Sequence, residues 1–188
     1  MASGVPPRYS LAVYCGSRTG QHPSYADAAC QLGRWMAANG VRLVYGGGGY
    51  GLMGTLASEV MTHGGSVVGI IPQSMVEREW AHQAVTELVV VQSMHERKAA
   101  MVQRADAMLA ISGGIGTLDE FFEAWTWRQL GHHNKPVGLL NTGGYYDGLI
   151  QFLQHSVRED FLGENHFDML EIGTNIPELP ERLLAACG

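Results

Sequence analysis

The chain has 188 residues, a length that suits one folded domain with a single sizeable core. Hydrophobic residues make up 46% of it and charged residues 16%, which predicts a packed globule and excludes a disordered chain. The formal net charge of −6 argues against nucleic acid or an anionic membrane as a partner, because both attract a broad basic surface.

The start of the chain and its cysteines indicate a cytoplasmic protein. We expect residues 1–8 to form a flexible tail, since they lack the apolar core of a signal peptide. No run of about 18 apolar residues follows that could span a membrane. Cys15, Cys30 and Cys187 cannot all pair and lack metal-type CxxC spacing, which favours a reducing compartment and no metal.

Short β-branched runs alternate with helical patterns along the whole chain. We expect strands at 11–15, 41–45, 66–71, 88–91, 107–111 and 137–140, with a weaker one at 169–172. Between and after them, helices are expected at 25–38, 52–63, 94–104, 118–130, 146–158 and 176–186. This alternation predicts one α/β domain over residues 9–188, a doubly wound, Rossmann-like, mostly parallel sheet with helices on both faces.

Such a sheet binds ligands beyond the carboxyl ends of its strands, where the following helices begin. The expected strands place five loops at that edge, at residues 16–22, 46–51, 72–80, 92–98 and 112–117. We therefore look for the site in these loops.

The first glycine cluster follows the second expected strand. Gly49, Gly51 and Gly54 form a G-x-G-x-x-G pattern between a strand and a helix, where N–H groups can converge on an anion. A tight strand-to-helix turn explains the same glycines without a ligand. A Rossmann dehydrogenase needs an acidic residue about 20 positions on, but the next strand ends at Pro72-Gln73. No Gly-Lys-Ser/Thr follows, so NAD and ATP-hydrolysing sites are both disfavoured.

The second glycine cluster, residues 112–120, also follows a short strand and precedes an apolar-faced helix. Two such loops on one domain indicate an anion site far more specifically than either alone. Thr117 and Glu120 match a capping box, in which Thr117 binds the amide of Glu120 and Glu120 returns to the N-cap amide. Capping is therefore the structural alternative to a chemical role for Glu120.

Another expected helix begins with an unusual charge pattern. Ser93 and Glu96 match a capping box, and Arg97 and Lys98 follow in the first turn. Cations there oppose the helix dipole, a conflict that a bound anion would remove. Because this loop and the second glycine cluster follow successive strands, we expect one pocket that holds amide donors, two cations and the Glu120 carboxylate.

Four of these segments together resemble one known family. Residues 46–54 are GGGGYGLMG, 94–98 are MHERK, 112–120 are SGGIGTLDE and 15–17 are CGS. They are similar to the GGGxxGLMG, MHxRK and PGGxGTxxE segments and the first loop of the LONELY GUY family of cytokinin riboside 5′-monophosphate phosphoribohydrolases, whose members are often mislabelled lysine decarboxylases. The likeness extends over residues 11–183. Ser112 stands where the family has proline, and Arg18 where a small hydroxyl residue is common.

The resemblance implies hydrolysis of the N-glycosidic bond of AMP or N6-substituted adenosine 5′-monophosphates, which gives free base and ribose 5-phosphate. It implies that Glu120 and Arg97 are catalytic, with Glu120 beside the anomeric carbon and Arg97 on the phosphate or the departing base. Lys98 and the amides of the second glycine cluster would bind phosphate, and Asp119 would order the ribose. The implied substrate-binding residues are Ser17, Gly47, Gly49, Gly51, Met94, Lys98, Gly113, Gly114, Gly116, Thr117 and Asp119.

The family also implies a homodimer that needs no cofactor and takes a small AMP-like nucleotide, not nucleic acid or membrane. The aromatic residues between Phe121 and Trp127 agree with a subunit interface, although their helical spacing also suits the core. Two other functions can be weighed, and the first of them, a decarboxylase, fits the sequence poorly. A pyridoxal phosphate decarboxylase needs a Schiff-base lysine, and only Lys98 and Lys135 exist. A non-catalytic nucleotide or pterin carrier of the molybdenum cofactor type would share the fold but lack turnover.

Overall fold

The computed structural model describes residues 7–77, 81–82 and 84–187. Most of the expected tail, residues 1–6, and the end of the 72–80 loop lie outside the described residues. Seven strands form one sheet: β1 (Tyr9–Tyr14), β2 (Val41–Tyr45), β3 (Val67–Pro72), β4 (Glu87–Val91), β5 (Ala107–Ala110), β6 (Val137–Leu140) and β7 (Leu170–Gly173).

The helices follow the strands in alternation. They are α1 (Pro23–Ala38), α2 (Gly51–Thr62), α3 (Gln73–Val76), α4 (Met94–Arg104), α5 (Ile115–Gln129), α6 (Asp147–Arg158), α7 (Glu164–Phe167) and α8 (Glu178–Ala185), with a 3₁₀ turn, η1 (Thr142–Gly144), before α6. None of the described helices is long and apolar enough to cross a membrane.

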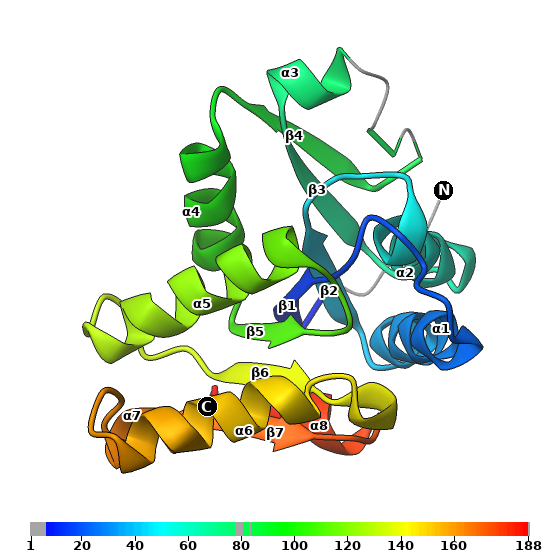
Figure 1. Cartoon of the computed structure of the whole chain (residues 1–188). Coiled ribbons are helices and arrows are strands. Elements are labelled where there is room, and N and C mark those ends of the chain that lie inside the picture. The colour runs from blue at the N-terminus through cyan, green and yellow to red at the C-terminus, as the bar shows by residue number, and fades with distance from the viewer. Residues whose placement is uncertain (1–6, 78–80, 83, 188) are drawn as a thin grey trace.

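The sheet is doubly wound, as the alternation of elements predicts. Its order is β4-β3-β2-β1-β5-β6-β7, and every neighbouring pair is parallel. The chain starts at the centre with β1, runs outward to β4, then returns to the other side of β1 with β5 (Figure 1). The strand order therefore reverses between β1 and β5, the place where such sheets bind ligands.

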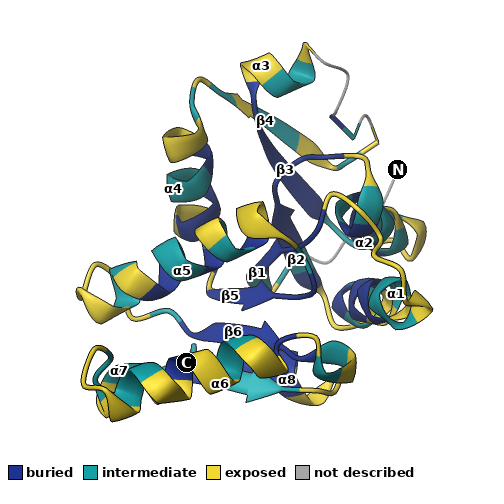
Figure 2. Ribbon diagram, in the orientation of Figure 1, coloured by how far each residue is buried: buried dark blue, intermediate teal, exposed yellow. Residues whose placement is uncertain are grey.

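Two apolar cores hold helices against the two faces of this sheet. Alternate residues of β1 separate the faces: Leu11 and Val13 pack with α1, α2 and α8, whereas Ala12 and Tyr14 pack with α4, α5 and α6. Both faces are covered, which explains why the central strands are buried along their length (Figure 2). The predicted fold class is confirmed.

The element boundaries differ from the sequence prediction at one place that affects the site. We expected the helix after the second glycine cluster to begin at Leu118, but α5 begins at Ile115, with Gly114 as its N-cap. The short helices α3 and α7 were not predicted, because four residues show no helical periodicity.

Candidate active site

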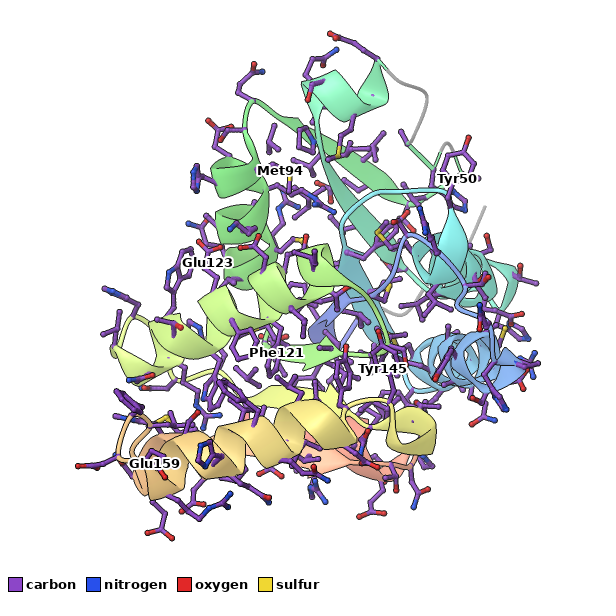
Figure 3. All side chains as sticks on the ribbon, viewed as in Figure 1. Tyr50, Met94, Phe121, Glu123, Tyr145 and Glu159 are labelled. Carbon is purple, nitrogen blue, oxygen red and sulfur yellow. The ribbon has the colours of Figure 1, made fainter. Side chains whose placement is uncertain are left out.

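A cavity of about 900 Å³ lies at the switch point of the sheet. It is lined by the loops that follow β1, β2 and β5, at residues 15–20, 46–53 in part, and 112–117, together with the starts of α4 and α5. Figure 3 labels three lining side chains from distant parts of the sequence: Tyr50 after β2, Met94 at the start of α4, and Tyr145 after β6. The loops singled out from the sequence thus meet around one cavity.

The predicted site residues divide into two groups by their position. Those that line the cavity are Ser17, Met94, Arg97, Gly113, Gly114, Gly116, Thr117 and Glu120. Five others do not line it: Gly47, Gly49, Gly51, Lys98 and Asp119. Gly46, Gly48, Cys15 and Tyr145, which the sequence reasoning left out of the site, line it instead.

Two glycines of the first cluster are needed to shape the cavity wall. Gly51 has φ of +59°, and a Cβ there would overlap the Ser17 carbonyl group, so it holds the β1 loop against the start of α2. A Cβ on Gly46 would lie 2.7 Å from Cζ of Arg97 and still closer to Nη2. Gly46 therefore gives the Arg97 side chain the space it occupies.

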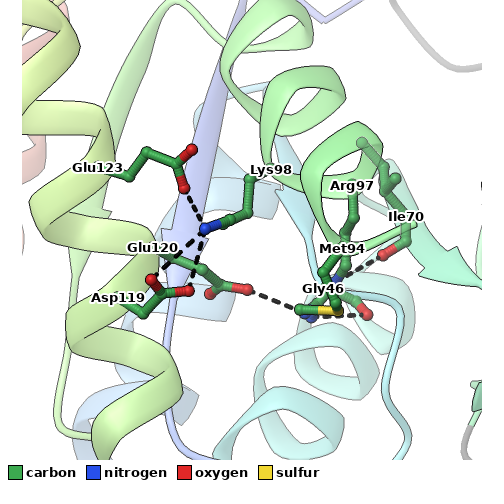
Figure 4. A network of polar contacts seen from close by, with 8 residues as sticks. All are labelled: Gly46, Ile70, Met94, Arg97, Lys98, Asp119, Glu120 and Glu123. Carbon is green, nitrogen blue, oxygen red and sulfur yellow. Dashed lines mark hydrogen bonds and ion pairs between the residues drawn. The ribbon is translucent and has the colours of Figure 1, made fainter.

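Arg97 extends from the first turn of α4 into a buried position that hydrogen bonds fix. Its Nε donates to the Ile70 carbonyl at 3.1 Å and its Nη2 to the Gly46 carbonyl at 3.1 Å. The remaining nitrogen, Nη1, lies 3.0 Å from Oε1 of Glu120 (Figure 4). Only 8% of the Arg97 side chain is exposed. Two backbone carbonyls thus fix the guanidinium so that its free edge faces Glu120.

Glu120 projects from the second turn of α5 into the same cavity wall. Its side chain is 10% exposed. Burial raises the pKa of this carboxyl, and the nearby Arg97 guanidinium opposes the rise. A carboxylate that is desolvated but held next to one cation suits proton transfer or stabilisation of a developing positive charge.

The capping-box explanation of Glu120 is wrong. Because α5 begins at Ile115, Thr117 lies inside the helix and the N-cap Gly114 makes no side-chain cap. Glu120 faces Arg97 and not the helix start. The other expected capping box forms: the Ser93 hydroxyl accepts from the Glu96 amide at 3.1 Å, although Glu96 returns to the Gln92 amide, one residue before the N-cap.

The second cation has a different environment from the one expected. Lys98 lies behind the Arg97–Glu120 pair and contacts the carboxylates of Asp119 and Glu123, with 12% of its side chain exposed. Asp119 and Glu123 thus compensate Lys98, and Glu120 compensates Arg97. From the sequence we expected a bound anion to compensate both cations.

The start of α5 offers the expected amide donors to the cavity. The first amides of any helix lack an acceptor within the helix, and the first helical bond here is from Leu118 N to the Gly114 carbonyl at 3.1 Å. Two tyrosines hold the loop before it: Tyr145 donates to the Gly113 carbonyl at 2.7 Å, and Tyr146 to the Ile111 carbonyl at 2.8 Å. Neither tyrosine belongs to a motif, so no sequence pattern pointed to them.

The two departures from the family pattern both face this cavity. Ser112 is buried, and its hydroxyl has no hydrogen-bond partner among the described residues. Arg18 lines the cavity with an exposed side chain. Part of the cavity wall is apolar, with Leu52, Met53, Ile71, Met75 and Met94. Polar loops and an apolar wall together suit a ligand with a phosphate at one end and a flat base at the other.

The described residues contain free thiols and no candidate metal site. Cys15, Cys30 and Cys187 are free cysteines. No group of three or more His, Cys, Asp or Glu side chains within the described residues is arranged to hold a metal ion.

Comparison with known proteins gives consistent relatives. A family model described as possible lysine decarboxylase matches residues 53–183. A probable cytokinin riboside 5′-monophosphate phosphoribohydrolase of Oryza sativa subsp. japonica is 46% identical over 173 residues, which cover 92% of this chain and 76% of that protein. A cytokinin riboside 5′-monophosphate phosphoribohydrolase of Arabidopsis thaliana is 45% identical over 174 residues, which cover 92% of this chain and 80% of the relative.

A solved structure shares the fold at lower identity. The molybdenum cofactor binding protein from the phototrophic bacterium Rippkaea orientalis superposes with a TM-score of 0.70 and 23% identity, over 98% of both chains. At this identity the likeness establishes the sheet and its helices, and nothing about the ligand.

Proposed function

The chain belongs to the LONELY GUY family of cytokinin riboside 5′-monophosphate phosphoribohydrolases, and we propose that it hydrolyses the N-glycosidic bond of AMP or of N6-substituted adenosine 5′-monophosphates. The products are the free base and ribose 5-phosphate. The observation that carries this proposal is the buried Arg97–Glu120 pair, 3.0 Å apart, in the wall of a cavity that also receives the amide-rich start of α5.

The 5′-phosphate binds at the start of α5 in this account. The helix N-terminus carries positive partial charge and unpaired N–H groups, which together favour an anion. Gly113, Gly114 and Gly116 line the cavity there and let the backbone come close to the phosphate oxygens. Arg97 contributes little directly, because Nε and Nη2 are already bonded to carbonyls.

Glu120 carries the chemical step. As the bond between the anomeric carbon and the base nitrogen breaks, positive charge develops on the ribose, as in glycoside hydrolysis generally. The ionised Glu120 stabilises that charge and takes a proton from the attacking water, whose oxygen bonds to the anomeric carbon. The base leaves with the electron pair of the broken bond and receives the proton that Glu120 took from the water, which returns Glu120 to its ionised form. Arg97 keeps Glu120 ionised and in place.

The base lies against the apolar wall in this arrangement. Ile71, Met75 and Met94 present apolar surface to the cavity, and methionine side chains adapt to flat or irregular ligands. An apolar N6-substituent would contact the same apolar side chains, so the proposed substrates include N6-substituted adenosine monophosphates.

Incubation of the protein with AMP, followed by chromatographic detection of adenine and ribose 5-phosphate, tests this function. We expect stoichiometric release of both products. Binding of AMP without release would instead identify a carrier. The relatives of 45–46% identity are named as enzymes, whereas the likeness to a molybdenum cofactor binding protein shows the fold alone.

A lysine decarboxylase does not fit the residues of this site. Pyridoxal phosphate chemistry requires a lysine that can form a Schiff base in the cavity. Lys98 is bonded to two carboxylates, and Nζ of Lys135 donates to the Val102 carbonyl at 2.7 Å. Neither lysine lines the cavity, so neither is placed to form the Schiff base there.

We also propose that residues 9–188 act as a single domain in a cytoplasmic homodimer. Free thiols on all three cysteines agree with a reducing compartment. Phe121 and Trp125 are buried in the chain's own core, so the apolar side chains that remain for an interface include the exposed Ile115 and Met94 at the cavity mouth. Sedimentation at micromolar concentration tests the dimer, and a species of only about 20 kDa would contradict it.

A further inference from the structure

A second layer of charge lies directly behind the Arg97–Glu120 pair. Nζ of Lys98 is 3.1 Å from Oδ2 of Asp119 and also forms an ion pair with Glu123 (Figure 4). Lys98 follows Arg97 on α4, and its two partners flank Glu120 on α5. The two charged layers therefore connect the same two helices, and the inner layer is the catalytic pair.

The charge balance explains why this second layer is needed. Three carboxylates, at positions 119, 120 and 123, occupy little more than one turn of α5, and like charges at this spacing repel. Burial and both neighbouring carboxylates raise the pKa of Glu120, whereas Arg97 and Lys98 lower it. Without Lys98, two negative charges next to Glu120 would have only Arg97 to oppose them.

The other groups that face Glu120 add no charge. On the β1 side these are Tyr14 and Cys15, and burial raises the pKa of each so far that both stay neutral. The charged groups around Glu120 are Arg97 and Lys98 on α4, and Asp119 and Glu123 on α5 itself. The ionisation of Glu120 thus depends on two cations against two carboxylates.

The contacts of Lys98 are with carboxylates of α5 and not with the cavity. Its ammonium group reaches Oδ1 and Oδ2 of Asp119 at 3.4 and 3.1 Å and forms an ion pair with the Glu123 carboxylate. It does not line the cavity. We propose that Lys98 is a positioning residue: it holds Asp119 and Glu123 against α4 and thereby keeps Glu120 charged and aligned with Arg97, without touching the substrate. This inference rests on the proposed function for its effect on turnover, but its effect on Glu120 is independent of it.

Titration of the Glu120 carboxyl by ¹³C NMR tests the proposal directly, with the resonance assigned by its loss in Glu120→Gln. We expect Lys98→Met to move this titration to higher pH and Lys98→Arg to restore it. The double variant Asp119→Asn/Glu123→Gln moves it to lower pH, because it removes the two charges that Lys98 balances. This second arm keeps the test decisive if Lys98→Met does not fold.

Lys135→Met is the matched control, since it removes the only other lysine, which is partly buried and bonded to backbone carbonyls of α4. It is expected to leave the Glu120 titration in place. A Glu120 titration that does not move in Lys98→Met, or in the double variant, would overturn the proposal.

Kinetics on AMP separate positioning from phosphate binding. For Lys98→Met we expect kcat to fall roughly tenfold. This is smaller than the about hundredfold or larger contribution of a general base, because Glu120 itself remains. The acid limb of the pH profile of kcat should move to higher pH. KM for AMP should stay within about twofold, because no substrate contact is lost. A large rise in KM with an unmoved pH profile would make Lys98 a phosphate ligand instead. If the wild type releases no adenine, the proposed function fails, while the NMR titration still decides the role of Lys98.

Discussion

Replacing Gly46 by alanine is a test of the catalytic pair that changes no charge and removes no functional group. A methyl group at this position would lie 2.7 Å from Cζ of Arg97 and closer to Nη2, so the guanidinium has to move. Gly46 is buried and its carbonyl accepts from that same Nη2, which leaves little room for the backbone to yield. The displaced Arg97 loses its bonds to the Gly46 and Ile70 carbonyls and its alignment with Glu120.

The expected magnitude follows from these contacts. Two hydrogen bonds from a charged donor, each worth about 1.5 kcal/mol or more, correspond to a loss of about 3 kcal/mol in the free energy of unfolding. For a chain of this size that lowers Tm by roughly 6–12 °C. Loss of the aligned cation next to Glu120 is expected to lower kcat for AMP about a hundredfold.

The assay is adenine release from AMP, with thermal unfolding measured on the same preparations. Gly148→Ala is the matched control, because a Cβ at Gly148, in the first turn of α6, meets no atom within 4 Å. In the double variant Gly46→Ala/Arg97→Ala we expect no loss of activity beyond Arg97→Ala alone, since both changes act on one side chain. A Gly46→Ala protein with normal kcat and Tm would refute the positioning of Arg97 described here.

Three further outcomes follow from the same site. Glu120→Gln keeps the shape of the side chain but removes its charge, so turnover of AMP should fall at least about a hundredfold while binding of AMP measured by calorimetry persists; near-normal turnover would remove Glu120 from the mechanism. The acid limb of the pH profile of kcat/KM should lie above the usual pKa of a glutamate, because burial raises the pKa of Glu120 and the reaction needs its ionised form. In Arg97→Met this limb should move to still higher pH; a move to lower pH would contradict the assignment. Tyr145→Phe loses the bond to the Gly113 carbonyl, about 1 kcal/mol, and should raise KM for AMP several-fold with little change in kcat; an unchanged KM would show that the loop needs no such support.

The sequence predicted the fold well because its signals are local. The runs at β2 and β6 and the helix α4 have the boundaries that the patterns indicate, since β-branched or apolar runs and a Ser93 cap mark them. The start of α5 was missed because Gly114 and Gly116 suggest a loop, whereas the helix already begins between them at Ile115. That error produced the false capping box.

The site was predictable to the extent that motifs carry it. Arg97 and Glu120 were both expected, and they meet across two helices at 3.0 Å. Lys98 was expected in the cavity, but its surroundings are set by α5 residues that pattern reasoning cannot place against it. Tyr145 supports the Gly113 loop from 32 residues away, which depends on the packing of η1 and α6 and leaves no local trace.

The most direct test of the central claim is a matched comparison of kcat/KM for AMP and for adenosine. Adenosine fits the same base and ribose contacts but leaves the start of α5 without its anion. A loss of only about 3 kcal/mol in the transition state lowers kcat/KM by roughly a hundredfold, so we expect AMP to be the better substrate by at least that factor. Equal values for the two substrates would contradict a phosphate site at the start of α5 and would identify an ordinary nucleosidase.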